Sequence, residues 1–231
     1  DWLLFSADYS QIELRALAHI SQDLGLLEAF QRGEDIHSST ASMMFDVPLH
    51  DVDAEQRRIA KVLNFGVIYG LSAHGISMQT GFSREEGASF IEAYFNKYPG
   101  INEYLEQVKV KARAEQYVET LLGRRRYLPD INSSNFNVRG GAERMAINMP
   151  IQGTAADIMK LAMIRVQNRL DKESLRTKML LQVHDELVFE MPKEEMDALK
   201  ELVFDEMPAA MDLDVTLKVD AKWGPTWGDM E

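Results

Sequence analysis

The alternation of apolar and polar positions predicts a chain with few strands. Residues 3–8 form a short apolar run that ends in polar residues, which is typical of a buried strand. Two further runs, at residues 178–183 and 187–191, surround the polar turn His184-Asp185-Glu186 and predict a β-hairpin. A last strand is expected over residues 215–222, and residues 117–122 are a candidate for one more. Strands this few indicate a small sheet.

Helical spacing predicts that most of the remaining chain is α-helix. Residues 83–86 (SREE) form a capping box, which opens a helix to about residue 98. Asp51 or Asp53 can cap a longer helix that runs to about Tyr69. Pro150 is expected to kink or stop a helix over 138–148, before the next helix over 154–170. Other helices are expected over residues 11–19, 24–31, 36–45, 101–116 and 194–207. This mixture indicates the α+β class.

Composition places the chain among globular proteins. Its 231 residues are 45% apolar and 27% charged, and they include no cysteine, so disulfides and thiolate metal sites are excluded. No apolar run is long enough to span a membrane, and no signal peptide is visible. The chain begins in the apolar run Trp2-Leu3-Leu4-Phe5, so we expect it to be a piece of a longer protein.

The charge distribution is uneven along the chain. A net charge of -12 argues against nucleic-acid binding, which depends on neutralising phosphates. However, residues 107–144 hold eight Lys or Arg against four Asp or Glu, whereas residues 185–231 hold four against fourteen. The middle of the chain is therefore locally basic, and the total charge does not decide what one groove binds.

Carboxylates stand at the ends of two apolar strands. Asp8 ends the first strand, and Asp185 with Glu186 lies in the predicted hairpin turn. If these strands are neighbours, the carboxylates face one pocket and suit Mg²⁺, which takes hard oxygen ligands and completes its shell with water and phosphates. Two such ions are a common device for phosphoryl displacement. Taken alone, each site is better explained as an ordinary turn, where Asp is common.

One predicted helix carries cations and rings on the same face. Arg57, Lys61, Phe65 and Tyr69 follow one another at steps of four residues, so they share one side of the helix. Two cations followed by two rings match the triphosphate tail and the base of a nucleotide. The plainer interpretation is an amphipathic helix with its rings in the core, but that does not explain why the cations continue the same stripe.

Three segments in this order resemble the motifs of family A DNA polymerases, the bacterial DNA polymerase I type. The first is Asp8-Tyr9-Ser10-Gln11-Ile12-Glu13-Leu14-Arg15. The second comprises Arg57, Lys61, Asn64-Phe65-Gly66 and Tyr69-Gly70, and the third is Gln182-Val183-His184-Asp185-Glu186. Likeness continues through Asp35-Ile36-His37, Gly123-Arg124-Arg125-Arg126-Tyr127 and the segment QGTAAD at residues 152–157. The resemblance covers essentially the whole chain.

The resemblance implies a role for each matching residue. Asp8 and Asp185, with the Tyr9 backbone carbonyl, would bind two Mg²⁺ ions, or Mn²⁺ in their place, and Glu186 would support them. Glu13 would exclude a ribose 2′-hydroxyl and Tyr69 would stand where the templating base enters. The residues implied to bind the deoxynucleoside triphosphate are Tyr9, Gln11, Glu13, His37, Arg57, Lys61, Phe65 and Tyr69, and Lys61 is also implied in catalysis. Those implied to contact primer-template DNA are Arg58, Arg124, Arg144, Asn148, Gln152 and His184.

The resemblance also implies an architecture and leaves alternatives open. We expect a small antiparallel palm sheet and a mostly helical fingers subdomain, a polymerase right hand without its thumb. Residues 1–30 and 136–231 would be palm and residues 31–135 mainly fingers, in a bacterial, cytoplasmic, nucleoid-associated protein whose N-terminal polymerase or nuclease region is separate or removed. The alternatives are a fragment that binds nucleotide or DNA without turnover, a single-subunit RNA polymerase, and a structural helical module whose motifs are coincidental.

Overall fold

A computed structural model describes residues 2–230 and divides the chain into two compact units. The first, here called the sheet unit, comprises the described residues up to Ala16 and from Thr154 onward. The second, the helical unit, comprises Leu17–Gly153. No described helix combines the length and the apolar composition that crossing a bilayer requires.

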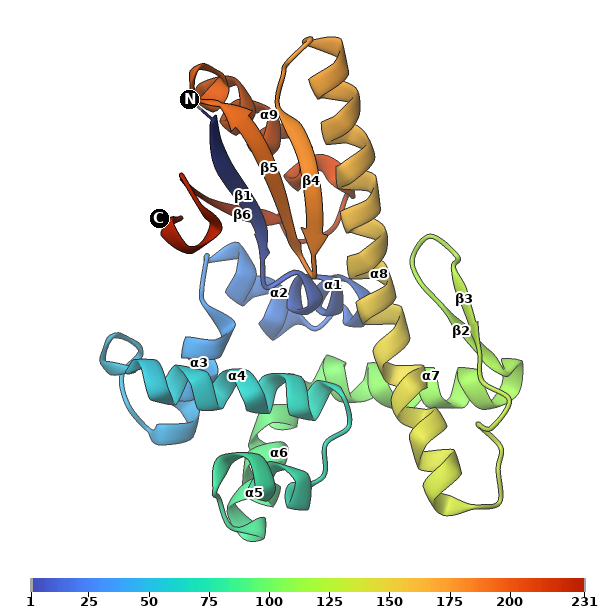
Figure 1. The fold of residues 1–231 in the computed structure, drawn as a ribbon. Coiled ribbons are helices and arrows are strands. Elements are labelled where there is room, and N and C mark those ends of the chain that lie inside the picture. Colours follow the sequence, from blue (N-terminus) through green and yellow to red (C-terminus); the bar gives the residue numbers. More distant parts are fainter. Residues whose placement is uncertain (1, 231) are drawn as a thin grey trace. The chain divides into compact units, whose positions relative to one another are not determined.

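The sheet unit contains a four-stranded antiparallel sheet in the order β4-β5-β1-β6 (Figure 1). The N-terminal strand therefore lies between two strands from the C-terminal third of the chain. The strands are β1 (Trp2–Ser10), β4 (Lys178–Val183), β5 (Glu186–Pro192) and β6 (Lys218–Gly224). This small antiparallel sheet beside many helices confirms the predicted α+β class.

One face of the sheet is covered by helices. Alternate residues of β1 and β5, among them Phe5, Ala7 and Phe189, are fully buried. They pack with the second half of α8 (Phe136–Lys172), which contributes Ile158 and neighbouring apolar residues, and with α9 (Met196–Glu206). Because side chains alternate across a strand, Asp8 and Glu186 point to the opposite face. The core therefore fixes the strands while the carboxylates stay outside it.

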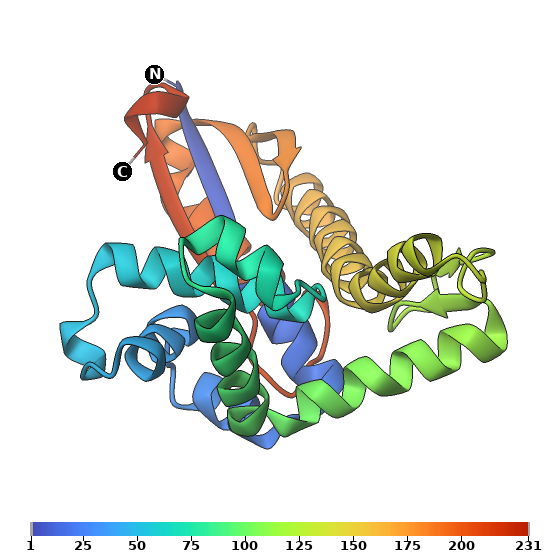
Figure 2. The same cartoon turned by 90° about the horizontal axis from the view of Figure 1, so that it is seen from below.

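The helical unit is built mainly from short helices. Its helices are α2 (Leu24–Gln31), α3 (Ile36–Phe45), α4 (Ala54–Ile68), α5 (Ala73–Thr80), α6 (Arg84–Lys97) and α7 (Pro99–Glu115), with the second half of α1 (Ile12–Ser21) and the first half of α8. Asp53 caps α4 and Ser83 caps α6, both through complete capping boxes. Figure 2 shows α7 leading into the ribbon formed by β2 (Tyr117–Glu119) and β3 (Arg125–Tyr127).

Four short 3₁₀ turns complete the assignment in the described chain: Leu49–Asp51, Lys193–Glu195, Pro208–Ala210 and Trp227–Asp229. The predicted ribbon strand over 117–122 is shorter than expected, ending at Glu119. Arg125–Tyr127, where no strand was predicted, pairs with β2 as a strand, because Gly123 at φ 77° closes a tight reversal. The last strand begins at Lys218 rather than Val215.

The expectation of two helices separated at Pro150 is wrong, because α8 continues through the proline. Proline removes the hydrogen bond to the carbonyl of Ala146 and costs about 3 kcal/mol. Both halves of α8 bury apolar side chains, such as Ile151 in the helical unit and Ile158 in the sheet unit. Each such side chain contributes about 1.5–3 kcal/mol, so burial on both sides outweighs the single lost hydrogen bond.

Candidate functional site

The strand pairing of the sheet unit gathers the predicted carboxylates. Asp8 on β1 lies directly opposite Glu186 on β5 in the antiparallel register. The backbone amide of Tyr9 donates to the carbonyl oxygen of Asp185 at 3.1 Å, which ties the end of β1 to the β4–β5 turn. Backbone hydrogen bonds thus bring Asp8, on β1, together with Asp185 and Glu186, which lie in the β4–β5 turn and at the start of β5.

The electrostatics of this cluster disfavour its full negative charge. Burial, followed by the neighbouring carboxylates of Asp185 and Glu186, raises the pKa of Asp8 to about 6, while Lys222 acts in the opposite direction. The Oδ1 atom of Asp8 is buried, and no described residue gives it a hydrogen bond. A proton or a cation at this position would relieve both the repulsion and the missing partner.

This donor set fits a hard divalent cation that completes its shell elsewhere. In the described part of the chain, no three His, Cys, Asp or Glu side chains are arranged as a complete metal site. Mg²⁺ commonly takes one or two carboxylates and keeps water or phosphate oxygens for its other positions. Tyr9 has only its backbone to offer, because its ring is buried in the core and its hydroxyl donates to the Met207 carbonyl at 2.6 Å.

Both turns beside the carboxylates have unusual backbone conformations. Gln11 follows β1 with φ 54° and His184 precedes Asp185 with φ 55°, a region that costs non-glycine residues about 1–3 kcal/mol. The first turn is held by Arg15, whose Nε donates to the Ser10 carbonyl at 2.8 Å and whose Nη1 donates to the Thr216 carbonyl at 2.6 Å. The surrounding structure thus fixes the backbone on both sides of the cluster.

Ser6 is a site residue that the sequence did not single out. It is 1% exposed on the same face of β1 as Asp8, and its hydroxyl donates to Oε1 of Glu186. This bond orients the Glu186 carboxylate, which has two oxygens and otherwise free rotation. Only the pairing of β1 with β5 reveals the contact, since the two residues are 180 positions apart.

In the helical unit, α4 carries the predicted stripe of cations and rings. Arg57 Nη2 lies 2.6 Å from Oδ2 of Asp35, and the Arg57 side chain remains 43% exposed. Lys61 is exposed one turn further along. The rings of Phe65 and Tyr69 are stacked with centroids 6.0 Å apart, although Tyr69 already stands at the C-cap. The stripe therefore exists as a face with a paired cation, an exposed cation and two stacked rings.

His37 adjoins this face from α3. Its ring lies 5.7 Å from the ring of Phe65, and its Nδ1 is 3.0 Å from the side-chain amide of Asn64 on α4. Burial lowers the pKa of His37 to about 4, assisted by Arg57 and Lys61 and opposed by Asp35. The sequence did not reveal this network, because its members come from two helices.

A cavity of about 370 Å³ connects the ring end of the stripe with a predicted DNA contact. It is lined by Val62, Phe65, Gly66, Tyr69, Leu71, Gln79 and Arg144. Gly70, which follows Tyr69, has φ 74°, a conformation that glycine adopts at little cost, and it lies beside the side chain of Arg144. Phe65, Tyr69 and Arg144, which the sequence analysis assigned to nucleotide and DNA, therefore line one cavity.

The other predicted DNA contacts are distributed over both units. Arg58 is exposed and bonded to Glu55 at 2.6 and 2.7 Å, an ion pair of small net value that a phosphate can replace. Arg125 is 3.2 Å from Glu119 and stacks 4.4 Å from the Tyr117 ring centroid. Arg124, Gln152 and His184 are exposed, whereas Oδ1 of Asn148 is buried without a hydrogen-bond partner in the described chain. Glu13 is half-buried in the first turn of α1.

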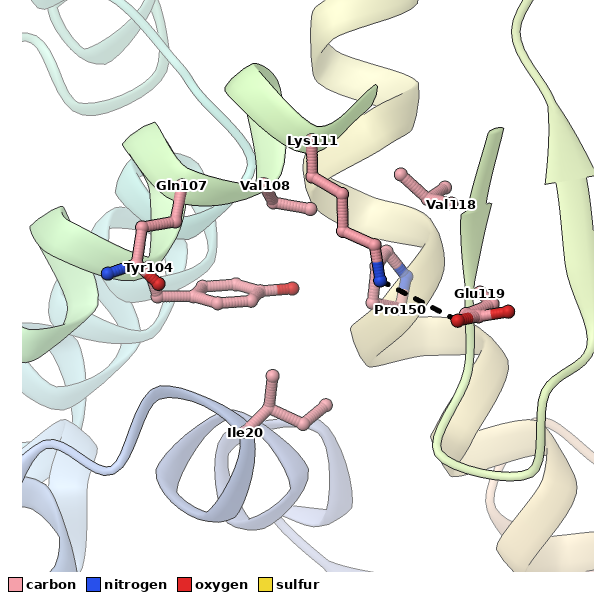
Figure 3. A pocket seen from close by; sticks show the side chains of 8 residues that line it. All are labelled: Ile20, Tyr104, Gln107, Val108, Lys111, Val118, Glu119 and Pro150. Carbon is pink, nitrogen blue, oxygen red and sulfur yellow. Dashed lines mark ion pairs between the residues drawn. The ribbon is translucent and has the colours of Figure 1, made fainter. Parts of the chain in front are cut away.

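Another cavity of about 370 Å³ in the helical unit contains none of the predicted residues (Figure 3). It is lined by Ile20, Tyr104, Gln107, Val108, Lys111, Val118, Glu119 and Pro150. Lys111 and Glu119 form an ion pair of 3.6 Å at one side, and the ring of Tyr104 projects into the space. Because its lining is mostly apolar and lacks exposed cations besides Lys111, it does not resemble a triphosphate site.

Comparisons with known proteins agree with the motifs. The profile of DNA polymerase family A matches residues 1–229. DNA polymerase I of Geobacillus stearothermophilus is 55% identical over 229 residues, and that of Bacillus subtilis (strain 168) is 51% identical over 229 residues. In both cases the alignment covers 99% of this chain and 26% of the relative.

A solved structure is similar over nearly the whole chain. It is the POL domain of Pol1 from M. smegmatis in complex with DNA primer-template and dNTP, with a TM-score of 0.94 and 49% identity, covering 97% of this chain and 40% of that chain. The chain spans about a quarter of the length of the curated relatives. A family match over this whole range, together with the fold and the motif residues, shows that the chain belongs to DNA polymerase family A.

Proposed function

We propose that this chain carries the nucleotidyl-transfer centre of a DNA-directed DNA polymerase, which adds deoxynucleoside triphosphates to a primer 3′-hydroxyl. The observation that carries the proposal is the carboxylate cluster, in which Asp8 has a buried oxygen without a partner and a pKa raised to about 6. A structural turn would not need repelling carboxylates held on rigid strands, whereas a cation site does.

Asp8 and Asp185, with the backbone carbonyl of Tyr9, would hold the two Mg²⁺ ions, or Mn²⁺ in their place. Bound there, the ions would supply activation of the 3′-hydroxyl and neutralisation of phosphate charge. Ser6 keeps Glu186 turned toward this group of oxygens. Positions fixed by strands suit a reaction in which placement and electrostatics, rather than covalent chemistry, provide the rate.

The helical unit would bind the nucleotide. Arg57, Lys61 and His37 would hold the triphosphate, with Lys61 stabilising the charge that builds during transfer. Arg57 is already oriented by its hydrogen bond to Asp35. Burial raises the pKa of Asp35, but hydrogen bonds from Arg57 and from the Ser38 amide outweigh it and keep this pKa below its ordinary value. Phe65 would pack against the sugar and base.

Two residues would control which nucleotide enters. Glu13 would occupy the space beside the sugar C2′ and reject a 2′-hydroxyl, with Gln11 contributing to the same nucleotide contact. Tyr69, stacked on Phe65, would stand where the templating base enters. The half-buried carboxylate of Glu13, placed next to the 2′ position, would exclude ribonucleotides sterically, and this would favour DNA synthesis over RNA synthesis.

Primer-template DNA would be contacted by polar and basic side chains. Arg144, Asn148, Gln152 and His184 suit the minor groove, where acceptors common to all Watson–Crick pairs allow shape to be checked without reading sequence. Arg58, Arg124 and the adjacent arginines suit phosphates. The protein would act at the nucleoid, in the cytoplasm of a bacterium.

A second candidate function is nucleotide or DNA binding without turnover, which is favoured by the fact that the chain spans 26% of its curated relatives. Primer extension on a short template with Mg²⁺ and four deoxynucleotides separates the two, with Asp185→Ala as the control. Extension that the control lacks supports the proposal. Triphosphate binding without extension supports the second candidate. The N-terminal polymerase region expected from the family resemblance, added as a separate chain, should then restore synthesis.

A further inference from the structure

A chain of hydrogen bonds in the helical unit connects three buried polar side chains. Thr40 donates from its hydroxyl to Oδ1 of Asn64 at 3.0 Å, and Nδ2 of Asn64 lies 3.0 Å from Nδ1 of His37. Thr40 and Asn64 are fully buried and His37 is 2% exposed. Buried polar groups of this kind are held in one arrangement, because breaking any bond leaves an unsatisfied group in a site without water.

The orientation of the Asn64 amide sets the donor and acceptor roles. Its oxygen accepts from the Thr40 hydroxyl, and its NH₂ group points to the imidazole. An amide nitrogen can only donate, so Nδ1 of His37 must accept and carries no proton. In a neutral imidazole the single proton then resides on Nε2.

The charges around His37 favour the neutral ring. Arg57 and Lys61 on α4 act against a further positive charge, and burial acts in the same direction. The one nearby carboxylate, Asp35 at the start of α3, is occupied by Arg57 through Oδ2 and by the Ser38 amide through Oδ1. A protonated ring would also turn Nδ1 into a donor facing another donor.

We propose that Asn64 and Thr40 are positioning residues, which hold His37 as a neutral imidazole with its proton on Nε2 so that it presents one N–H donor to an anionic phosphate. This inference rests on the proposed function for the identity of the ligand, but the tautomer itself does not. Arg57 and Lys61 then supply the positive charge, while His37 supplies direction through one hydrogen bond.

The tautomer is measured directly by NMR of the whole chain labelled with ¹⁵N-histidine. The ring nitrogens report which one is protonated, and the His37 signals among the five histidines are assigned with His37→Gln. At pH 7 we expect an Nε2–H tautomer that remains neutral down to about pH 5, since the pKa of His37 is lowered to about 4. A ring with its proton on Nδ1, or a cation at pH 7, would overturn the inference.

Variants test whether the two neighbours cause this state. Asn64→Asp replaces the NH₂ donor by a carboxylate oxygen, so we expect the His37 proton to move from Nε2 to Nδ1, because burial, Arg57 and Lys61 still disfavour a second proton on the ring. Thr40→Val should give a mixture of tautomers, whereas Thr40→Ser keeps the hydroxyl and the parental spectrum. Ser39→Ala, on the same helix, removes a hydroxyl that bonds to Glu34 instead and serves as the matched control. An unchanged His37 spectrum in folded Asn64→Asp would refute the positioning role.

Kinetics then connect the tautomer to the phosphate. If the chain extends primers, Asn64→Asp should raise the KM for deoxynucleotides about tenfold or more, with a smaller change in kcat, because a hydrogen bond to a charged group is lost. Thr40→Ser, which keeps the hydroxyl, should keep the parental KM. An altered NMR spectrum with an unchanged KM would contradict the proposed phosphate contact but not the positioning of His37 by its neighbours. The two claims can therefore fail separately.

Discussion

The amide of Tyr9 donates to the carbonyl of Asp185 across 3.1 Å, and this backbone bond extends the pairing of β1 with β5 to join the first and third sequence motifs. Asp8, which precedes Tyr9, is paired directly with Glu186, which follows Asp185. The carboxylate cluster is therefore maintained by the sheet, whose core side chains lie on its other face. Holding the carboxylates of Asp8, Asp185 and Glu186 close together opposes folding, so their repulsion should lower the free energy of unfolding.

Asp8→Asn should stabilise the protein at neutral pH in the absence of divalent metal. The parental carboxyl has a pKa of about 6 when folded against 3.8 as an isolated group, so folding must tolerate its charge above pH 6. We expect a gain of about 1–2 kcal/mol, allowing for screening because Asp8 is partly solvent-exposed. The gain should be largest above pH 6, shrink between pH 6 and 4, and vanish below the unfolded pKa.

Urea unfolding in EDTA across this pH range checks the prediction, with Glu201→Gln on the exposed surface of α9 controlling for the loss of one negative charge. If Asp8→Asn were less stable than the parent at pH 7, the repulsion described above would not be the dominant effect on this residue.

Glu13→Ala should relax the choice of sugar. Removing a half-buried carboxylate from the first turn of α1 opens the space that would exclude a 2′-hydroxyl. We expect the preference for deoxynucleotides, measured as a ratio of kcat/KM values, to fall about tenfold to a hundredfold. Glu28→Ala, an exposed residue of α2, is the control. An unchanged ratio in Glu13→Ala would remove Glu13 from sugar selection.

Asp23→Ala should weaken the helical unit strongly. This carboxylate is 1% exposed, caps α2 by accepting from the Leu26 amide at 2.9 Å, and accepts from the Gly100 amide of α7 at 2.8 Å. Losing two charge-assisted bonds should lower the free energy of unfolding by about 2–4 kcal/mol. Asp23→Asn keeps one acceptor oxygen, so its free energy of unfolding should fall by roughly half as much as that of Asp23→Ala. Unfolding in urea, followed by circular dichroism, measures both decreases. Equal loss in both variants would mean that charge rather than hydrogen bonding matters.

Pro150→Ala should stabilise α8. Alanine restores an amide that can donate to the Ala146 carbonyl, and we expect a gain of about 1–2 kcal/mol after the smaller loss of apolar contact. Pro208→Ala is the matched control, because Pro208 starts a 3₁₀ turn, where proline is tolerated. A lower thermal midpoint in Pro150→Ala would show that the proline ring contributes more through packing than it removes through the backbone.

Local signals in the sequence were sufficient for part of the fold. The predicted bounds of α2 and α3 coincide with the structure because each helix has an aspartate cap immediately before it, at Asp23 and Asp35. The prediction failed at Pro150, where burial on both sides of the proline overrides a local rule. The helix α5 was missed although it is as long as α2, since its one buried residue, Ile76, offers no apolar periodicity, whereas α2 buries four apolar residues.

The candidate site divides in the same way. Asp8, Asp185 and the α4 stripe were visible because strand ends and four-residue spacing are local patterns. Ser6 and Thr40 were not, because a single small hydroxyl has no meaning until the strand or helix opposite it is known. The direction of the Asp8 pKa shift likewise depends on neighbours that are distant in the sequence.

The position of β1 in the middle of the sheet also sets an order of events during synthesis. The helical unit is one continuous segment, so all its residues emerge together and can pack early. Ser6 and its neighbours must wait, unpaired, for partners 180 residues later. Pairing at such sequence separation is slow because loop closure precedes any gain in contacts. The carboxylates of Asp8, Asp185 and Glu186 therefore come together only after the whole helical unit has emerged from the ribosome, and a chain that ends before β5 would hold those helices without the cluster.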